Sequence, residues 1–109
     1  MSENWIEVCK LDDIVPDTGV CALVEDKQVA LFRTSGGDVF AIDNFDPFSK
    51  ANVLSRGIVG SLGDKLVVAS PIYKQHFCLE TGSCLEDENV KLAVYPVKTA
   101  EDKVAVQVA

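Results

Sequence analysis

Four cysteines and one histidine are the side chains of this sequence best suited to bind a metal or act as a nucleophile. The cysteines form no Cys-x-x-Cys pair, the spacing used by many metal and redox sites. A single histidine excludes a site built of several imidazoles, and as a general base it would need an orienting partner and a nucleophile. We therefore expect no catalytic and no metal-binding residue, with His76 as an ordinary residue on a strand face. The four cysteines, expected to behave as small apolar residues, are Cys9, Cys21, Cys78 and Cys84.

Two short segments with a proline each are the other places where polar and aromatic side chains gather. They are Asn44-Phe45-Asp46-Pro47-Phe48 and Ser70-Pro71-Ile72-Tyr73. We expect Asp46 and Ser70 to hydrogen-bond backbone groups of their loops, as Asp and Ser commonly do in turns. No catalytic role follows from either residue.

The aromatic side chains of these segments allow two interpretations. Phe48 and Tyr73 can fill the space between the loops by apolar contact, because a void is costly in a close-packed protein. Alternatively, together with Phe45 they expose an aromatic patch of the kind that is enriched in protein interfaces. Lys50, Arg56, Lys65 and Lys74 are the basic residues near these loops, and they either dock a partner or are solvated surface. The candidate partner contacts are Phe45, Phe48, Arg56, Tyr73 and Lys74.

Turn signals recur at short intervals between runs rich in Val, Ile, Leu and Phe, which is typical of an all-β sandwich or barrel built of hairpins. Helix is expected only as a short turn at 11–16, with Asp12 as its cap and Pro16 ending it. The connection from Asn44 to Arg56 has no clear strand pattern, and such loops are usually functional or mobile. Cys78 and Cys84 flank a predicted turn at 81–83 and could face each other and oxidise. The predicted strands are 4–9, 20–24, 27–33, 38–43, 57–62, 65–70, 76–80, 83–86, 91–97 and 103–108.

Length, composition and charge narrow the classes of function. The 109 residues are expected to form one domain, residues 1–109, with a hydrophobic content of 48% that suits a packed core. The net charge of −7 opposes a phosphate backbone, so nucleic acid is not an expected partner. Apolar runs fall far below the roughly 18 residues of a membrane span. With no signal peptide pattern at the start, the sequence predicts a cytoplasmic protein.

The two proline-containing segments resemble the cluster-binding loops of Rieske domains. A Rieske centre is held by two cysteines and two histidines, as Cys-x-His followed roughly twenty residues later by Cys-x-x-His. By this resemblance, Asp46 and Ser70 occupy the thiolate positions, while Phe48 and Tyr73 occupy the imidazole positions. The resemblance implies a Rieske-like fold in which all four ligands of the [2Fe-2S] cluster have been replaced.

A short chain that keeps this fold without its ligands is similar to the small subunits of NAD(P)H-dependent nitrite reductases. Besides the two loops, the similarity covers Trp5, Val20-Cys21-Ala22-Leu23 and Val53-Leu54-Ser55-Arg56-Gly57. The resemblance implies an accessory, non-catalytic subunit that binds no cofactor. Its large partner subunit would hold the sirohaem, iron-sulfur and FAD groups and reduce nitrite to ammonia in nitrate and nitrite assimilation.

Two other functions remain open from the sequence. The chain could be a Rieske-type, ferredoxin-like electron carrier in which an altered ligand set binds iron. It could also be a general interaction module of the same fold that serves another oxidoreductase. Nitrite as a substrate follows from the resemblance alone, because no residue of the chain specifies it.

Overall fold

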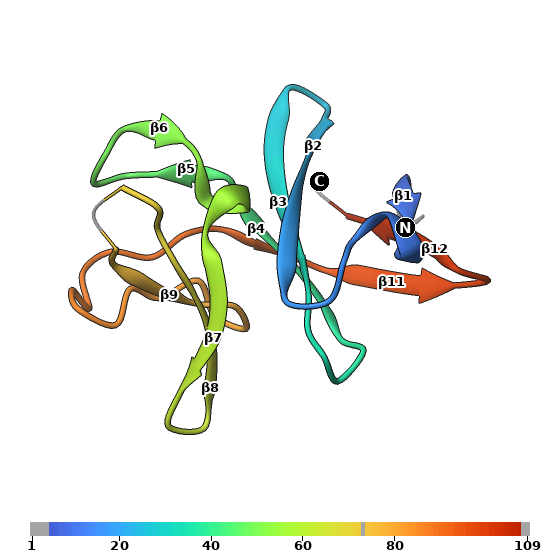
Figure 1. Ribbon diagram of the computed structural model, residues 1–109. Helices are drawn as coiled ribbons and strands as arrows, with labels where there is room; N and C mark the ends of the chain where they lie inside the picture. Colours follow the sequence, from blue (N-terminus) through green and yellow to red (C-terminus); the bar gives the residue numbers. More distant parts are fainter. Residues whose placement is uncertain (1–4, 73, 108–109) are drawn as a thin grey trace.

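The polypeptide folds into short antiparallel strands with two 3-10 turns, in a computed structural model that describes residues 5–72 and 74–107 (Figure 1). The predicted all-β class is confirmed. The 3-10 turns are η1 (Leu11–Asp13) and η2 (Leu54–Arg56). The strands are β1 (Ile6–Lys10), β2 (Thr18–Val24), β3 (Lys27–Arg33), β4 (Val39–Asp43), β5 (Phe45–Asp46), β6 (Ala51–Asn52), β7 (Ile58–Leu62), β8 (Lys65–Ala69), β9 (His76–Cys78), β10 (Val94–Tyr95), β11 (Val97–Ala100) and β12 (Lys103–Val106).

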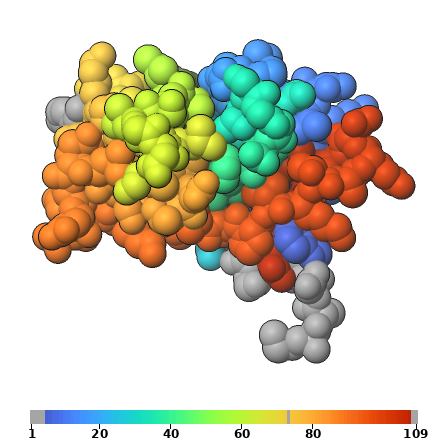
Figure 2. Space-filling model, turned by 90° about the horizontal axis from the view of Figure 1, so that it is seen from below, coloured from blue at the N-terminus to red at the C-terminus, as the bar shows by residue number. Residues whose placement is uncertain are grey.

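The strands form three principal sheets and one small hairpin. The sheet β10-β4-β3-β2 has β1-β12-β11 on one side and β7-β8-β9 on the other. Figure 2 shows this order, with the turn between β3 and β4 lying between the yellow and orange part of the chain and the blue and red strands of the two ends. The hairpin β5-β6 projects beside the β7-β8-β9 sheet (Figure 1).

Strand β3 is the physical centre of this arrangement, because it is buried on both faces. Successive side chains of a strand point to opposite sides, so Val29 and Leu31 enter one core and Ala30 and Phe32 enter the other. All four are completely buried. The second core, which contains Phe32, also receives Phe77 from β9, and it supports the loops that carry the candidate site.

The carboxyl-terminal hairpin contains the predicted strand 103–108, whose side chains alternate between buried and less buried positions. Val104 and Val106 are fully buried, and Ala105 between them is only partly buried. The turn before this strand, Glu101-Asp102, has positive φ at both residues. Such a pair is the signature of a tight hairpin whose twist matches that of its strands.

Four details of the predicted elements are wrong. The segment 83–86 makes only isolated bridges, and the predicted strand 91–97 is divided into β10 and β11 around Pro96, which has no N–H for a ladder. The connection from Asn44 to Arg56 is more ordered than expected, since it contains β5, β6 and η2. Asp12 is not the cap of the first helical turn. Lys10 is the N-cap, and its backbone N–H donates to Asp13 Oδ2 at 2.9 Å.

Candidate functional site

A buried hydrogen bond joins the two loops where the sequence places a degenerate cluster site. Asp46 ends β5 and Ser70 follows β8, and the Ser70 hydroxyl donates to Asp46 Oδ2. Asp46 is fully buried and Ser70 is 1% exposed. A hydrogen bond between two groups that are both shielded from water is costly to break, because neither group can bond water instead. The two side chains that the resemblance places at the thiolate positions therefore fasten the loops to each other.

Each loop also closes on itself, through the same two residues. The second carboxylate oxygen of Asp46 accepts the backbone N–H of Phe48 at 2.9 Å, and the Ser70 hydroxyl accepts that of Ile72 at 3.4 Å. The Asp46 carbonyl accepts the N–H of Lys50 at 2.7 Å, and the Ser70 carbonyl accepts that of Lys74 at 3.1 Å. The expected bonds to loop backbone are present. The bond between the two side chains was not anticipated from the sequence.

The aromatic residues of the loops have different surroundings. Phe48 is half-buried and packs on the core, with its ring centroid 6.2 Å from that of Phe77 at an interplanar angle of 45°. This contact agrees with the space-filling interpretation. Phe45 is 38% exposed and so remains available to a partner. Tyr73 lies outside the described residues.

The turn η2 holds the bases of both loops. The backbone N–H of Ser55 donates to Asn44 Oδ1 at 2.7 Å, and that of Leu54 donates to the Asn44 carbonyl at 3.2 Å. On the other side, Gly57 lies against Ala69, the residue before Ser70, so closely that a Cβ would stand 2.3 Å from the Ala69 carbonyl oxygen. The sequence analysis gave Asn44 no role of its own. In the structure it is almost fully buried and joins η2 to the start of the first loop.

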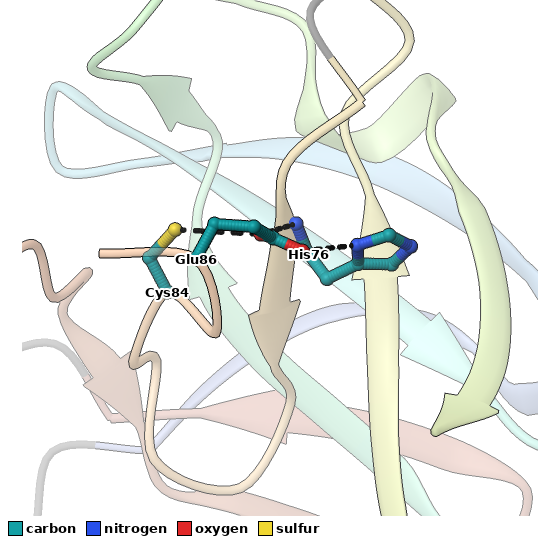
Figure 3. A network of polar contacts seen from close by, with 3 residues as sticks. All are labelled: His76, Cys84 and Glu86. Atoms are coloured by element: carbon teal, nitrogen blue, oxygen red, sulfur yellow. Dashed lines mark hydrogen bonds and ion pairs between the residues drawn. The ribbon is translucent and has the colours of Figure 1, made fainter. Parts of the chain in front are cut away.

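His76 has a carboxylate partner that the sequence analysis also missed (Figure 3). The His76 ring nitrogen Nδ1 lies 2.7 Å from Glu86 Oε2, and the His76 backbone N–H donates to Glu86 Oε1 at 2.7 Å. Burial alone would raise the pKa of Glu86. The hydrogen bonds from His76 and the charge of its ring outweigh that effect and lower the pKa below its ordinary value. The only hint in the sequence is that the two residues flank the turn at Gly82.

This pair orients an imidazole without supplying a nucleophile. The sulfur of Cys84 lies 3.7 Å from Glu86 Oε1, so it bonds the carboxylate and not the ring. Burial raises the pKa of Cys84, and hydrogen bonds from backbone groups only partly oppose this, so the thiol form is favoured. A thiol is a weaker nucleophile than a thiolate. The geometry supports a structural role for His76 and Glu86.

Replacement of Glu86 by glutamine should reduce the sensitivity of the fold to acid. Because the pKa of Glu86 is lower in the folded chain, the pair adds stability above the ordinary glutamate value of 4.5, and this is lost as the pH falls through the folded value. The effect is small because 45% of the Glu86 side chain is exposed. The effect is measured by chemical unfolding at two pH values, one near neutral and one well below the ordinary pKa of glutamate. Glu88→Gln is the control, and it should lose as much stability on acidification as the wild type. If Glu86→Gln loses that same amount, the prediction is wrong.

The cysteines build no site. All four are free thiols, with Cys78 and Cys84 buried. Burial would raise the pKa of Cys78, but hydrogen bonds from Thr81 and from the backbone at Glu80 outweigh it and lower the pKa. Within the ranges 5–72 and 74–107, no group of three or more His, Cys, Asp or Glu side chains is placed to hold a metal ion. The same ranges contain no helix long and apolar enough to cross a bilayer.

Comparison with known proteins places this geometry in a family. Residues 4–107 match the family described as a Rieske-like [2Fe-2S] domain. The chain is 48% identical over 99 residues to the nitrite reductase (NADH) small subunit of Escherichia coli K12, covering 90% of this chain and 92% of that protein. The chain belongs to the nitrite reductase small subunits, a family of Rieske-like domains.

Solved structures and a longer relative agree with this assignment. The solution structure of the nitrite reductase [NAD(P)H] small subunit from Erwinia carotovora superposes with a TM-score of 0.83 at 53% identity, covering 96% of this chain and 82% of that chain. The ferredoxin of carbazole 1,9a-dioxygenase from Nocardioides aromaticivorans shares the fold alone, with a TM-score of 0.83 at 21% identity. The chain is also 41% identical, over 94% of its length, to 11% of a protein named nitrite reductase [NAD(P)H] large subunit from Klebsiella oxytoca.

The residues at the ligand positions do not fit the [2Fe-2S] cluster of the family description. Iron-sulfur clusters are bound by thiolates and, in Rieske centres, by imidazoles. Asp46 and Ser70 are turned toward each other in a hydrogen bond, and Phe48 has no donor atom and packs against Phe77. The sequence offers only the phenol of Tyr73 at the fourth position. These side chains are therefore not of the types that bind such a cluster, and Asp46 and Ser70 already form a hydrogen bond with each other.

Proposed function

We propose that this chain is an accessory, non-catalytic small subunit of a cytoplasmic NAD(P)H-dependent nitrite reductase, and that it works by docking on the large subunit. The observation that carries the proposal is the buried bond between Asp46 and Ser70. It places a structural fastening where an electron carrier would hold its cluster. The identity to proteins named nitrite reductase small subunits supports the choice of enzyme.

The large subunit is the proposed partner for a second reason. In the Klebsiella oxytoca relative, the matching segment is part of a protein that is itself named a large subunit. A domain joined covalently to another is at high effective concentration and can make contacts that separate chains make by docking. We propose that the sirohaem, iron-sulfur and FAD groups lie on the large subunit, and that residues 1–109 form one domain that carries no cofactor.

Co-expression of the tagged chain with a nitrite reductase large subunit from the same organism tests this function. We expect the two to co-purify, and we expect nitrite reduction by the large subunit to be faster or longer lasting with the small subunit than without it. Full activity and full stability of the large subunit alone would refute the accessory role. Co-purification with a different oxidoreductase would favour the general interaction module.

Iron analysis of the purified chain separates the proposal from the electron-carrier alternative. We expect colourless protein without stoichiometric iron or sulfide, even after anaerobic isolation, because the ligand positions offer neither thiolate nor imidazole. A brown preparation with stoichiometric inorganic sulfide would establish the carrier function instead.

A further inference from the structure

The two loops of the site repeat one local design. The segments Asp46–Lys50 and Ser70–Lys74 each start with a polar residue whose side chain accepts the N–H two positions on. Each continues with proline and ends with a lysine whose N–H returns to the first carbonyl. The bond between Asp46 and Ser70 holds the two copies side by side. Lys50 and Lys74 therefore occupy equivalent positions, each at the end of a loop that begins with one partner of the bond between Asp46 and Ser70.

Both lysines have a backbone conformation that disfavours a lysine. The φ angle is 58° at Lys50 and 63° at Lys74, in the left-handed region that Gly, Asn and Asp enter more easily. The other non-glycine residues with positive φ in the described part of the chain are Asp and Glu. Lysine at both positions thus opposes the local preference, and residues held in such backbone conformations cluster at functional sites.

Neither lysine side chain makes a hydrogen bond or an ion pair within the part of the chain that the structure describes. Both are exposed, and no ion pair engages either of them among residues 5–72 and 74–107. Arg56 is also exposed and ends η2, the turn that connects the bases of the two loops. Three cations without ion pairs therefore gather around the loops of a chain whose net charge is −7.

Apolar side chains are also exposed on these two loops. Phe45 is 38% exposed and Ile72 is 47% exposed, and Pro71 is exposed beside Ile72. An apolar centre with a charged rim is the usual anatomy of a protein interface. The positive charge of this rim favours an acidic partner surface, since complementary charge steers association and like charge opposes it.

We propose that Lys50 and Lys74, with Arg56 at the loop bases, dock this chain onto a carboxylate-rich surface of the large subunit, with Phe45 and Ile72 at the centre of the contact. The proposal rests on the proposed function and adds the docking face and the chemistry of the partner surface. The acidic remainder of the chain would repel the same surface, so the charges also fix the orientation of docking.

The test uses variants that change charge and leave the backbone conformation acceptable. Lys50→Asn/Lys74→Asn removes both charges, and asparagine tolerates the left-handed region. Lys50→Arg/Lys74→Arg retains the charges. Lys91→Asn/Lys98→Asn is the matched control, because it removes two exposed lysines outside these loops. Affinity for the purified large subunit is measured at several salt concentrations, and thermal unfolding of each chain is recorded.

The asparagine pair at 50 and 74 should bind about tenfold more weakly or worse, with a smaller salt dependence. Its thermal stability should equal or exceed that of the wild type, because the backbone strain is relieved. Should that pair fold poorly, Lys50→Gly/Lys74→Gly removes the same charges without strain. Unchanged affinity of the charge-free pairs, or an equal loss in the control, overturns the docking face while leaving the proposed function intact. Failure of the wild-type chain to bind overturns both.

Discussion

Replacement of Asp46 by alanine is expected to lower the free energy of unfolding by about 2–6 kcal/mol, the sum for two donors that lose their acceptor. The carboxylate accepts the Ser70 hydroxyl and the N–H of Phe48, and alanine leaves both donors without their acceptor. Each buried donor that loses its acceptor costs about 1–3 kcal/mol. The loops would separate, and Phe48 would lose part of its support on Phe77.

Urea unfolding of a set of variants at this pair distinguishes the hydrogen bonds from side-chain volume. Asp46→Asn keeps the size and one acceptor oxygen, so its loss should be smaller than that of Asp46→Ala. Ser70→Ala removes only the donor between the loops. In a double-mutant cycle, Asp46→Ala and Ser70→Ala should be strongly non-additive, because both break the same bond. Additive effects, or a loss below about 1 kcal/mol for Asp46→Ala, would show that the loops are held together by other contacts.

The fold could be predicted from the sequence where side-chain periodicity and turn residues act locally. Val104 and Val106 alternate with partly buried or exposed neighbours, and the turn at Glu101-Asp102 lies between the predicted strands 91–97 and 103–108. The strand prediction was wrong where a single proline interrupted a run of apolar residues. Pro96 divides the predicted strand 91–97 into a strand that pairs with β4 and another that pairs with β12. A pattern of apolar residues does not specify such a change of partner.

The contacts of the site were less accessible to sequence reasoning, because they join residues that are distant in the chain. Asp46 and Ser70 are 24 positions apart, and His76 and Glu86 are 10 apart. Propensities describe what a side chain does with its own turn, which is why the bonds of Asp46 and Ser70 to loop backbone were foreseen. Whether such a side chain also hydrogen-bonds another side chain depends on how the two loops pack together in the fold. Asn44 was missed for the same reason.

The contacts of the site are those of a structural connection between the two loops. Asp46 and Ser70 bond each other, Phe48 packs on the core, and η2 connects the loop bases through Asn44. A pair of irons would bind the two loops of a Rieske domain together through four ligands. Here a buried hydrogen bond and aromatic packing do so, which leaves the outer faces of the loops free for recognition.

Replacement of Gly57 by alanine should destabilise the chain by about 3 kcal/mol, at the upper end of the overpacking range. The added Cβ would lie 2.3 Å from the Ala69 carbonyl oxygen and 2.7 Å from Val68 Cγ2, and the first of these is backbone that cannot turn aside. Because φ at Gly57 is −73°, the conformation itself accepts alanine, so the effect measures space alone. The turn η2 must then move away from β8, which separates the loop bases and displaces Arg56. The variant should therefore also bind the large subunit less tightly.

Gly60 provides the matched control, because it lies three residues on in β7 and a Cβ there meets nothing within 4 Å. Gly60→Ala should be neutral or slightly stabilising, since alanine restricts the unfolded chain more than glycine does. Thermal and urea unfolding of the two variants, compared under the same conditions, gives the cost of the contact between η2 and β8. Equal stability of Gly57→Ala and Gly60→Ala would mean that η2 yields easily. The loop bases would then be held mainly by Asn44 and by the bond between Asp46 and Ser70.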